Sequence, residues 1–378
     1  MRLAFIKKKA SAYGGAERYL QTLVSQLLKS GHEVHIYSCA WPEESGITVH
    51  KVKITRRGSF FSTLTFSRNV GSAIRKDGGY DCVVSFERTA CQDIYRAGEG
   101  CHAEWLRIRR LTEPLYKKLS FKINPLHILL LGLEKRLFSS TPFIVANSNM
   151  VKGQIMRYYN VQEEKITVVY NGVDLRRFTP ENRERWRGPV RKGLGISEGT
   201  KLALFIGSGF KRKGLATFMD SVSLLKKEDM KLLIIGKDNA GVYKTMAERH
   251  GISDRTIFLG PQEDIEKFYA ASDLFVLPTL YDPFSNATLE AMASGIPAIT
   301  TKNNGAAELI KNGEEGFVLD DLSDAKELSE KIGISLKNLG TMGKKAREKS
   351  LELSIEKVAR EFTQIIQLSK EKGSIVHG

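Results

Sequence analysis

The sequence predicts an α/β protein built of two doubly wound, parallel-sheet domains in tandem. Short apolar runs rich in Val and Ile alternate with segments of helical periodicity, and this alternation is typical of βαβ units. The alternation pauses near the middle of the chain and then restarts. The length of 378 residues is also that of two or three domains.

In the first half, a short apolar strand is followed by a loop that contains Gly14 and Gly15, and then by a helix from about Ala16 to Ser30. Gly31 ends this helix, as a glycine after the last turn commonly does. The strands of this half are expected at residues 3–6, 33–38, 47–54, 81–86 and 143–148, and the stretch 165–174 closes it.

Residues 176–199 are polar and charged, and they are expected to form a linker or an irregular segment. The second series of strands is expected at residues 202–208, 231–236, 256–260, 274–279, 297–301 and 316–319. The spacing of apolar residues in 354–370 predicts a long amphipathic helix.

The net charge of +15 is concentrated in the first half of the chain. Residues 1–175 hold 26 Lys and Arg against 15 Asp and Glu. This surplus indicates an anionic partner, which can be a nucleic acid, an anionic lipid surface or a phosphorylated substrate. A nucleic acid is disfavoured because the basic residues are not interleaved with aromatic side chains that could stack on bases.

The four cysteines form no C-x-x-C pair and the seven histidines no H-x-x-x-H pattern, so we expect reduced cysteines and no protein-bound metal. The longest apolar run, at residues 128–133, is too short to span a bilayer. The N-terminal charges follow the first apolar stretch, which is the wrong order for a signal peptide. We therefore expect a cytoplasmic protein.

Two loops after predicted strands have features of ligand sites. The paired glycines Gly14 and Gly15 can admit a ligand close to the backbone, or they can form only a tight turn. The stretch GSGFKRKG places Arg212 and Lys213 before a helix, where they can bind phosphate oxygens or remain a solvated basic turn. Neither loop has the spacing of a dinucleotide fingerprint or of a P-loop.

A third loop, YDPFSNATLEA, carries two carboxylates around the start of a helix. Asp282 follows a buried strand, Ser285 or Asn286 is suited to cap the helix, and Glu290 lies about one turn inside it. A pyrophosphate could lie on the helix N-terminus, with hydroxyl groups bound by a carboxylate on either side. This arrangement favours a nucleotide-sugar clamp over a glycosidase-like acid/base pair, although a turn residue and a surface charge would fit the same segment.

Taken together, GGAER, NGVD, GSGFKRKG and Asp282-x7-Glu290 followed by AMASGIPAIT resemble a retaining GT-B glycosyltransferase of family four, of the subgroup that contains the bacterial lipopolysaccharide core α-glucosyltransferases. The resemblance implies two Rossmann-like domains that face a central cleft. The acceptor-binding domain would comprise residues 1–170 and the C-terminal helix 354–370, which crosses back to it. Residues 171–353 would bind the nucleotide-sugar donor.

The resemblance also implies roles for individual residues. Arg212 and Lys213 would neutralise the diphosphate leaving group, Asp282 would bind hydroxyls of the donor sugar, and Glu290 the ribose. Relatives usually carry Glu where this chain has Asp282. Other donor contacts would come from Gly14, Gly15, Gly260, Phe284, Ser285, Asn286, Ala287 and from His102, beside Glu99.

The reaction implied is transfer of glucose from UDP-glucose, by metal-independent front-face displacement, to a lipopolysaccharide-core or related envelope glycan. The acceptor would be lipid-linked or phosphorylated, with no tightly bound cofactor. Residues 105–122 mix apolar and basic side chains, which suits peripheral attachment to the anionic inner face of the cytoplasmic membrane or a solvated helix. A sugar-nucleotide epimerase or a phosphorylase on the same fold is the alternative, together with a nucleic-acid-binding protein.

Overall fold

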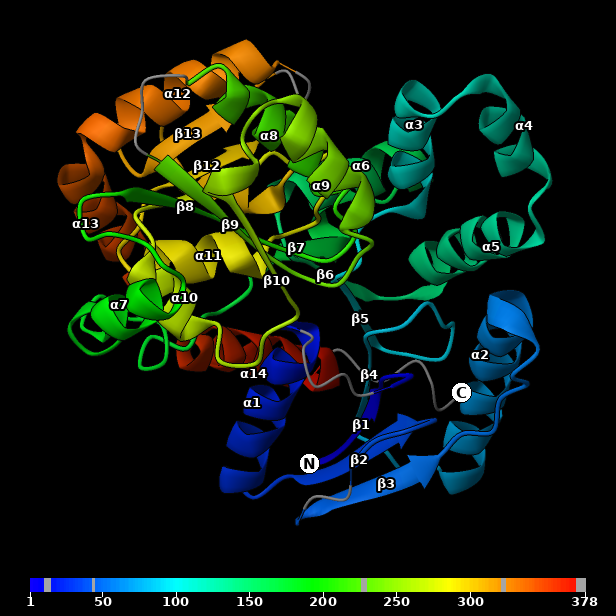
Figure 1. The fold of residues 1–378 in the computed structure, drawn as a ribbon. Helices are drawn as coiled ribbons and strands as arrows, with labels where there is room; N and C mark the ends of the chain where they lie inside the picture. The colour runs from blue at the N-terminus through cyan, green and yellow to red at the C-terminus, as the bar shows by residue number, and fades with distance from the viewer. Residues whose placement is uncertain (10–14, 43–44, 226–229, 321–323, 372–378) are drawn as a thin grey trace. The chain divides into compact units, whose positions relative to one another are not determined.

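The computed structural model describes residues 1–9, 15–42, 45–225, 230–320 and 324–371. Its contacts divide the chain into two compact units. Unit 1 comprises Met1–Asn171 and the chain from Ile355 onward, and unit 2 comprises Gly172–Ser354. Each unit has a parallel sheet with helices packed against it, so the predicted α/β class with two Rossmann-like sheets is confirmed (Figure 1).

The sheet of unit 1 has seven parallel strands in the order β3-β2-β1-β4-β5-β6-β7. The strands are β1 (Arg2–Ile6), β2 (Glu33–Ser38), β3 (Ile47–Lys51), β4 (Cys82–Ser85), β5 (Ile94–Ala97), β6 (Phe143–Ala146) and β7 (Ile166–Val168). The helices are α1 (Gly15–Lys29), α2 (Gly58–Asp77), α3 (His102–Thr112), α4 (Leu115–Ile123), α5 (Pro125–Ser140), α6 (Asn149–Tyr159), the 3₁₀ turn η1 (Glu163–Lys165) and α14 (Ile355–Glu371).

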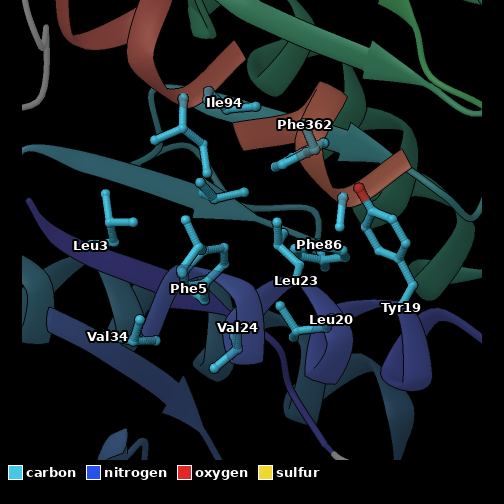
Figure 2. Packing of buried hydrophobic residues seen from close by; sticks show 14 of the residues in the cluster. Leu3, Phe5, Tyr19, Leu20, Leu23, Val24, Val34, Phe86, Ile94 and Phe362 are labelled. Atoms are coloured by element: carbon cyan, nitrogen blue, oxygen red, sulfur yellow. The ribbon is translucent and has the colours of Figure 1, made fainter. Parts of the chain in front are cut away.

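The C-terminal helix α14 belongs to unit 1 because its apolar face completes the core there. Figure 2 shows Phe362 of α14 gathered with Phe5 of β1 and with Leu20 and Leu23 of α1. The Phe362 ring meets the Tyr19 ring edge-on, with 6.1 Å between their centroids. Each such buried side chain contributes about 1.5–3 kcal/mol, which is why a helix distant in sequence is held against α1.

The sheet of unit 2 has six parallel strands in the order β10-β9-β8-β11-β12-β13. The strands are β8 (Lys201–Ile206), β9 (Met230–Ile235), β10 (Thr256–Gly260), β11 (Leu274–Leu277), β12 (Ala298–Thr301) and β13 (Gly316–Leu319). The helices are α7 (Asn182–Gly193), α8 (Leu215–Ser223), α9 (Gly241–Arg249), α10 (Glu266–Ala271), α11 (Asn286–Ala293), α12 (Ala325–Lys337) and α13 (Leu339–Ser350), with the 3₁₀ turns η2 (Ser253–Arg255), η3 (Gly305–Leu309) and η4 (Leu351–Leu353).

The prediction that residues 176–199 are a linker or irregular segment was wrong, because α7 lies inside this stretch. Its inner face is made of arginines rather than apolar residues. Arg183, Arg187 and Arg191 follow one another at i, i+4 spacing, and all three reach the buried carboxylate of Asp273, at 3.2, 2.8 and 3.5 Å. Asp273 in turn accepts a hydrogen bond from the Leu202 amide of β8, at 2.9 Å.

In each sheet the chain order reverses once, between β1 and β4 in unit 1 and between β8 and β11 in unit 2. In open α/β sheets, ligands bind at such a switch point, outside the carboxyl ends of the strands. Both positions therefore direct the search for functional residues. Within the described part of the chain, none of the helices combines the length and the apolar character needed to cross a membrane.

Candidate functional site

The turn that leads from β8 into α8 holds Arg212 and Lys213 against the end of β11. Gly214 ends this turn with a φ of +78°, and a Cβ added there would lie 1.9 Å from the carbonyl oxygen of Pro278. Only glycine accommodates both the left-handed backbone and this close approach. The turn thus brings two basic residues to the switch point of the unit 2 sheet.

Lys213 and Asp282 form a buried ion pair at this switch point. The Lys213 Nζ contacts Oδ2 of Asp282, and the two residues are 9% and 7% exposed. Burial lowers the pKa of the Lys213 ammonium, and the Asp282 carboxylate opposes this shift only in part. The backbone of Asp282 is fixed as well, because its amide donates to Asn303 O and its carbonyl accepts from Gly305 N, both at 2.9 Å.

Arg212 lies next to this pair and is half-buried. Its Nη1 donates to the carbonyl oxygen of Tyr281 at 2.9 Å, and its own carbonyl accepts from the Leu280 amide at 2.8 Å. These bonds tie the basic turn to the loop that carries Asp282. The guanidinium has five N–H donors, so it can also bind an anion at this edge of the sheet.

The N-terminus of α11 lies directly after Asp282 and is capped as predicted by one of the two candidates, Ser285. The Ser285 hydroxyl accepts from the Thr288 amide at 3.3 Å. The buried Asn304, which we did not identify from the sequence, holds this helix start in place. Its Oδ1 accepts from the amides of Ser285 and Ala306, at 3.0 and 3.1 Å.

The Asn304 amide nitrogen donates to the hydroxyls of Thr288 and Thr300, at 3.2 and 2.9 Å. The side chain therefore joins the end of β12 to the start of α11. A polar residue directly after a buried strand and before Gly305 was the signal available in the sequence. The first-turn residues Phe284, Ser285, Asn286 and Ala287 all lie at this helix start.

Glu290 lies one turn into α11, and its carboxylate is positioned by a buried tyrosine. The Tyr269 hydroxyl lies 3.0 Å from Glu290 Oε2 and 3.1 Å from the carbonyl oxygen of Ala287. Gly260 ends β10, the edge strand of the same sheet, with a φ of +69°. Its carbonyl oxygen accepts from the Gly236 amide at 3.1 Å.

The other predicted donor contacts belong to unit 1. Gly15 is the first residue of α1, whereas Gly14 lies outside the described residues. His102 begins α3, and its backbone amide donates to the Glu134 carboxylate at 2.8 Å. The His102 Nε2 lies 3.0 Å from the Nδ1 of His127. Burial, reinforced by the nearby Arg88, lowers the pKa of His102 to about 4, so the imidazole is neutral near pH 7.

The structure therefore brings Arg212, Lys213 and Asp282 together at one strand edge, followed by the α11 N-terminus with Glu290 one turn inside it. Two cations and a helix N-terminus can stabilise a diphosphate. Carboxylates on either side of that helix start can accept hydrogen bonds from sugar hydroxyls. Among the described residues, no cluster of three or more His, Cys, Asp or Glu side chains could hold a metal ion.

Comparison with known protein families gives two matches that follow one another along the chain. Residues 13–177 match the family described as Glycosyltransferase Family 4. Residues 187–352 match the family described as Glycosyl transferases group 1. The second match contains all the candidate residues of unit 2.

Similar proteins include the lipopolysaccharide glucosyltransferase WaaG of Escherichia coli strain K12, which is 23% identical over 87% of this chain and 88% of its own. The N-acetyl-alpha-D-glucosaminyl L-malate synthase of Bacillus anthracis is 25% identical over 93% of both chains. Among solved structures, that of WaaG has a TM-score of 0.82 and 21% identity, covering 96% of this chain and 99% of its own. HepE of Anabaena in complex with UDP-glucose has a TM-score of 0.75 and 18% identity, covering 97% and 99%.

Proposed function

Since this chain belongs to the GT-B glycosyltransferases, with a family 4 domain followed by a group 1 domain, we propose that it transfers glucose from UDP-glucose to a glycan of the cell envelope, with retention of configuration. The choice of donor is supported by HepE, which has a similar fold and was solved with UDP-glucose. The choice of acceptor is supported by the similarity to a lipopolysaccharide glucosyltransferase.

The observation that carries this proposal is the buried Lys213–Asp282 pair beside the N-terminus of α11. The donor diphosphate lies between Arg212, Lys213 and this helix start, where the charges are already in place before it binds. The first-turn amides that support the phosphates belong to Phe284, Ser285, Asn286 and Ala287.

The two carboxylates bind the hydroxyl groups on either side of the diphosphate. Asp282 accepts from the glucose hydroxyls through the oxygen that does not pair with Lys213, and Glu290, positioned by Tyr269, accepts from the ribose. The short side chain of Asp282 is compatible with its pairing to Lys213, since a longer carboxylate would have to fold back within this buried site. Gly260 borders the base, and Gly14, Gly15 and His102 of unit 1 complete the contacts to the donor.

In the reaction, a bond forms between the acceptor hydroxyl oxygen and the anomeric carbon, on the face from which the diphosphate leaves. The bond from the anomeric carbon to the phosphate oxygen breaks, and this oxygen takes the acceptor proton. Arg212 and Lys213 stabilise the negative charge that develops on the leaving group, which is the largest electrostatic contribution available in this site. The step requires no metal ion because these two cations and the α11 N-terminus carry the charge.

The enzyme acts in the cytoplasm at the inner face of the membrane, and we assign attachment to the surface of α3 and α4. Leu111, Leu115, Tyr116 and Ile123 are each 70% exposed or more. They alternate with basic residues, namely Arg110, Lys117, Lys118 and Lys122. Exposed apolar side chains among cations are typical of helices that lie on an anionic lipid surface.

Titration calorimetry with UDP-glucose tests the donor site. Replacing Glu290 by alanine removes a charged acceptor of the ribose hydroxyls, and it should weaken binding by about tenfold to a hundredfold. Glu248→Ala, on the exposed face of α9, is the matched control and should bind as the wild type. Equal affinity of the Glu290 and Glu248 variants would remove the ribose role, and loss of turnover in a chelator would remove the metal-independent mechanism.

A further inference from the structure

Unit 1 contains a pocket of about 450 Å³ at the switch point of its own sheet. Lys7, Lys8 and Lys9 follow β1, Glu87 and Arg88 follow β4, and Glu99 follows β5, so one wall is made of loops at the carboxyl ends of three adjacent strands. The opposite wall is made of the first turns of α2 and of Leu130 on α5. This is where an open α/β sheet binds its ligand.

The pocket repeats an arrangement found in unit 2. Lys7 Nζ lies 3.2 Å from Glu87 Oε1, and the two side chains are 9% and 17% exposed. Lys7 follows β1 and Glu87 follows the neighbouring β4, just as Lys213 follows β8 and Asp282 follows the neighbouring β11. Each unit therefore has a largely buried lysine–carboxylate pair at its switch point, and in unit 2 this pair belongs to the proposed donor site.

The charges of the unit 1 pocket are not balanced. Arg88 is used by Glu99 and by the buried Glu134, whose Oε1 lies 2.9 Å from its Nε. Lys8 and Lys9 form no ion pair within the described residues, and the Lys8 Nζ lies 3.5 Å from the Thr63 hydroxyl. The pocket thus has two cations that its own carboxylates do not neutralise.

The α2 wall adds hydrogen-bonding groups of the kind that anions require. Ser59, Ser62 and Thr63 line the pocket from the first turns of this helix. The first turn of α2 has no acidic residue, and no side chain caps its N-terminus. A hydroxyl donates one hydrogen bond, so this wall complements a group with several acceptor oxygens.

From these contacts we propose that the unit 1 pocket binds a phosphate group carried by the acceptor sugar, with Lys8 and Lys9 supplying the charge and Ser59, Ser62 and Thr63 the hydrogen bonds. This inference rests on the proposed function, because it defines the class of acceptor as a phosphorylated sugar. A volume of about 450 Å³ is that of a site for a small organic molecule, so the pocket accommodates a monosaccharide together with its phosphate.

Calorimetry with glucose 6-phosphate, glucose and inorganic phosphate, with and without saturating UDP, tests the proposal. Glucose 6-phosphate should bind more tightly than either of the other two compounds. The double variant Lys8→Gln/Lys9→Gln should weaken its binding by at least about tenfold, since each lost charge-assisted contact contributes about 1.5–3 kcal/mol. The matched variant Lys29→Gln/Lys51→Gln removes two exposed charges elsewhere in unit 1 and should bind as the wild type.

Three results would overturn the proposal. They are equal binding by the two double variants, equal binding of phosphate and glucose 6-phosphate, and loss of anionic-vesicle binding in the Lys8/Lys9 variant, which would assign these lysines to the lipid surface. Circular dichroism and the midpoint of thermal unfolding confirm that both variants fold. UDP-glucose binding is measured on the same proteins, because its absence in the wild type would refute the proposed function and leave the phosphate site standing.

Discussion

At the scale of single residues, the Lys213–Asp282 pair is the feature of the donor site that is most sensitive to change. Both side chains are buried, so removing one partner leaves an uncompensated charge. We expect Asp282→Asn or Lys213→Met alone to lower the free energy of unfolding by about 3–5 kcal/mol. The double variant should lose less than the sum of the two, because it leaves no buried charge. Urea denaturation of the four proteins measures this coupling, and additive losses would show that the pair is not coupled.

His102 provides a pH-dependent prediction. Its pKa of about 4 in the folded protein lies below the usual value near 6.5, so the unfolded chain takes up the proton first as the pH falls. The free energy of unfolding should therefore decrease between about pH 6.5 and pH 4, by up to about 1.4 kcal/mol per pH unit from this group. In His102→Gln this contribution is missing.

The measurement is urea denaturation of the wild type and of His102→Gln at several pH values in this window. The difference between their free energies of unfolding should shrink as the pH falls. A constant difference across the window would mean that His102 does not titrate with a lowered pKa.

At the scale of elements, two glycines of the β8–α8 turn separate backbone strain from steric clash. Gly209 and Gly214 both have a φ of +78°, but only at Gly214 does an added Cβ meet an atom, 1.9 Å away in Pro278. Gly209→Ala should cost about 1–2 kcal/mol, the penalty of the left-handed region. Gly214→Ala should cost several kcal/mol more and should also weaken UDP-glucose binding, because the turn carries Arg212 and Lys213.

Thermal unfolding and calorimetry of the two alanine variants compare the two costs directly. Similar midpoints for Gly209→Ala and Gly214→Ala would show that the contact with Pro278 is relieved at little cost. The basic turn would then not depend on its packing against β11.

The elements that the sequence failed to predict share a physical cause, which is buried arginine. The strand β5 contains Arg96, which is 3% exposed, lies over the Tyr19 ring and donates to Asn171 at 2.8 Å. The helix α7 turns its row of arginines inward to Asp273. Hydrophobic periodicity treats arginine as a surface residue, so it detected neither element.

The elements that were predicted correctly are those with apolar interiors or local caps. The strands β2, β10 and β13 have the predicted bounds, and Ser285 caps α11 through a bond to an amide three residues away. The Lys213–Asp282 pair joins residues 69 positions apart in the chain. The contact made by Asn304 likewise depends on the packing of β12 beside β11. Such pairings depend on strand order, which local sequence patterns do not specify.

At the scale of the whole molecule, the two units use one design twice. Each sheet reverses its strand order once, and each reversal carries a lysine–carboxylate pair that is largely buried. The units differ in what surrounds the pair. In unit 2 a capped helix with two carboxylates follows it, whereas in unit 1 two further lysines and an uncapped, hydroxyl-bearing helix start surround it. This difference is the physical basis for assigning a nucleotide sugar to one and a phosphorylated sugar to the other.

The net charge of +15 and the exposed apolar residues of α3 and α4 together predict binding to anionic membranes. Replacing Leu115 and Ile123 by serine removes apolar area that would insert at the lipid interface, and it should reduce sedimentation with anionic vesicles severalfold. Val242→Ser/Ile334→Ser, which changes exposed apolar residues of unit 2, is the matched control and should sediment as the wild type. Raising the salt concentration should weaken the binding that remains, because the basic side chains then act alone. Equal sedimentation of the two variants would place the membrane contact outside α4.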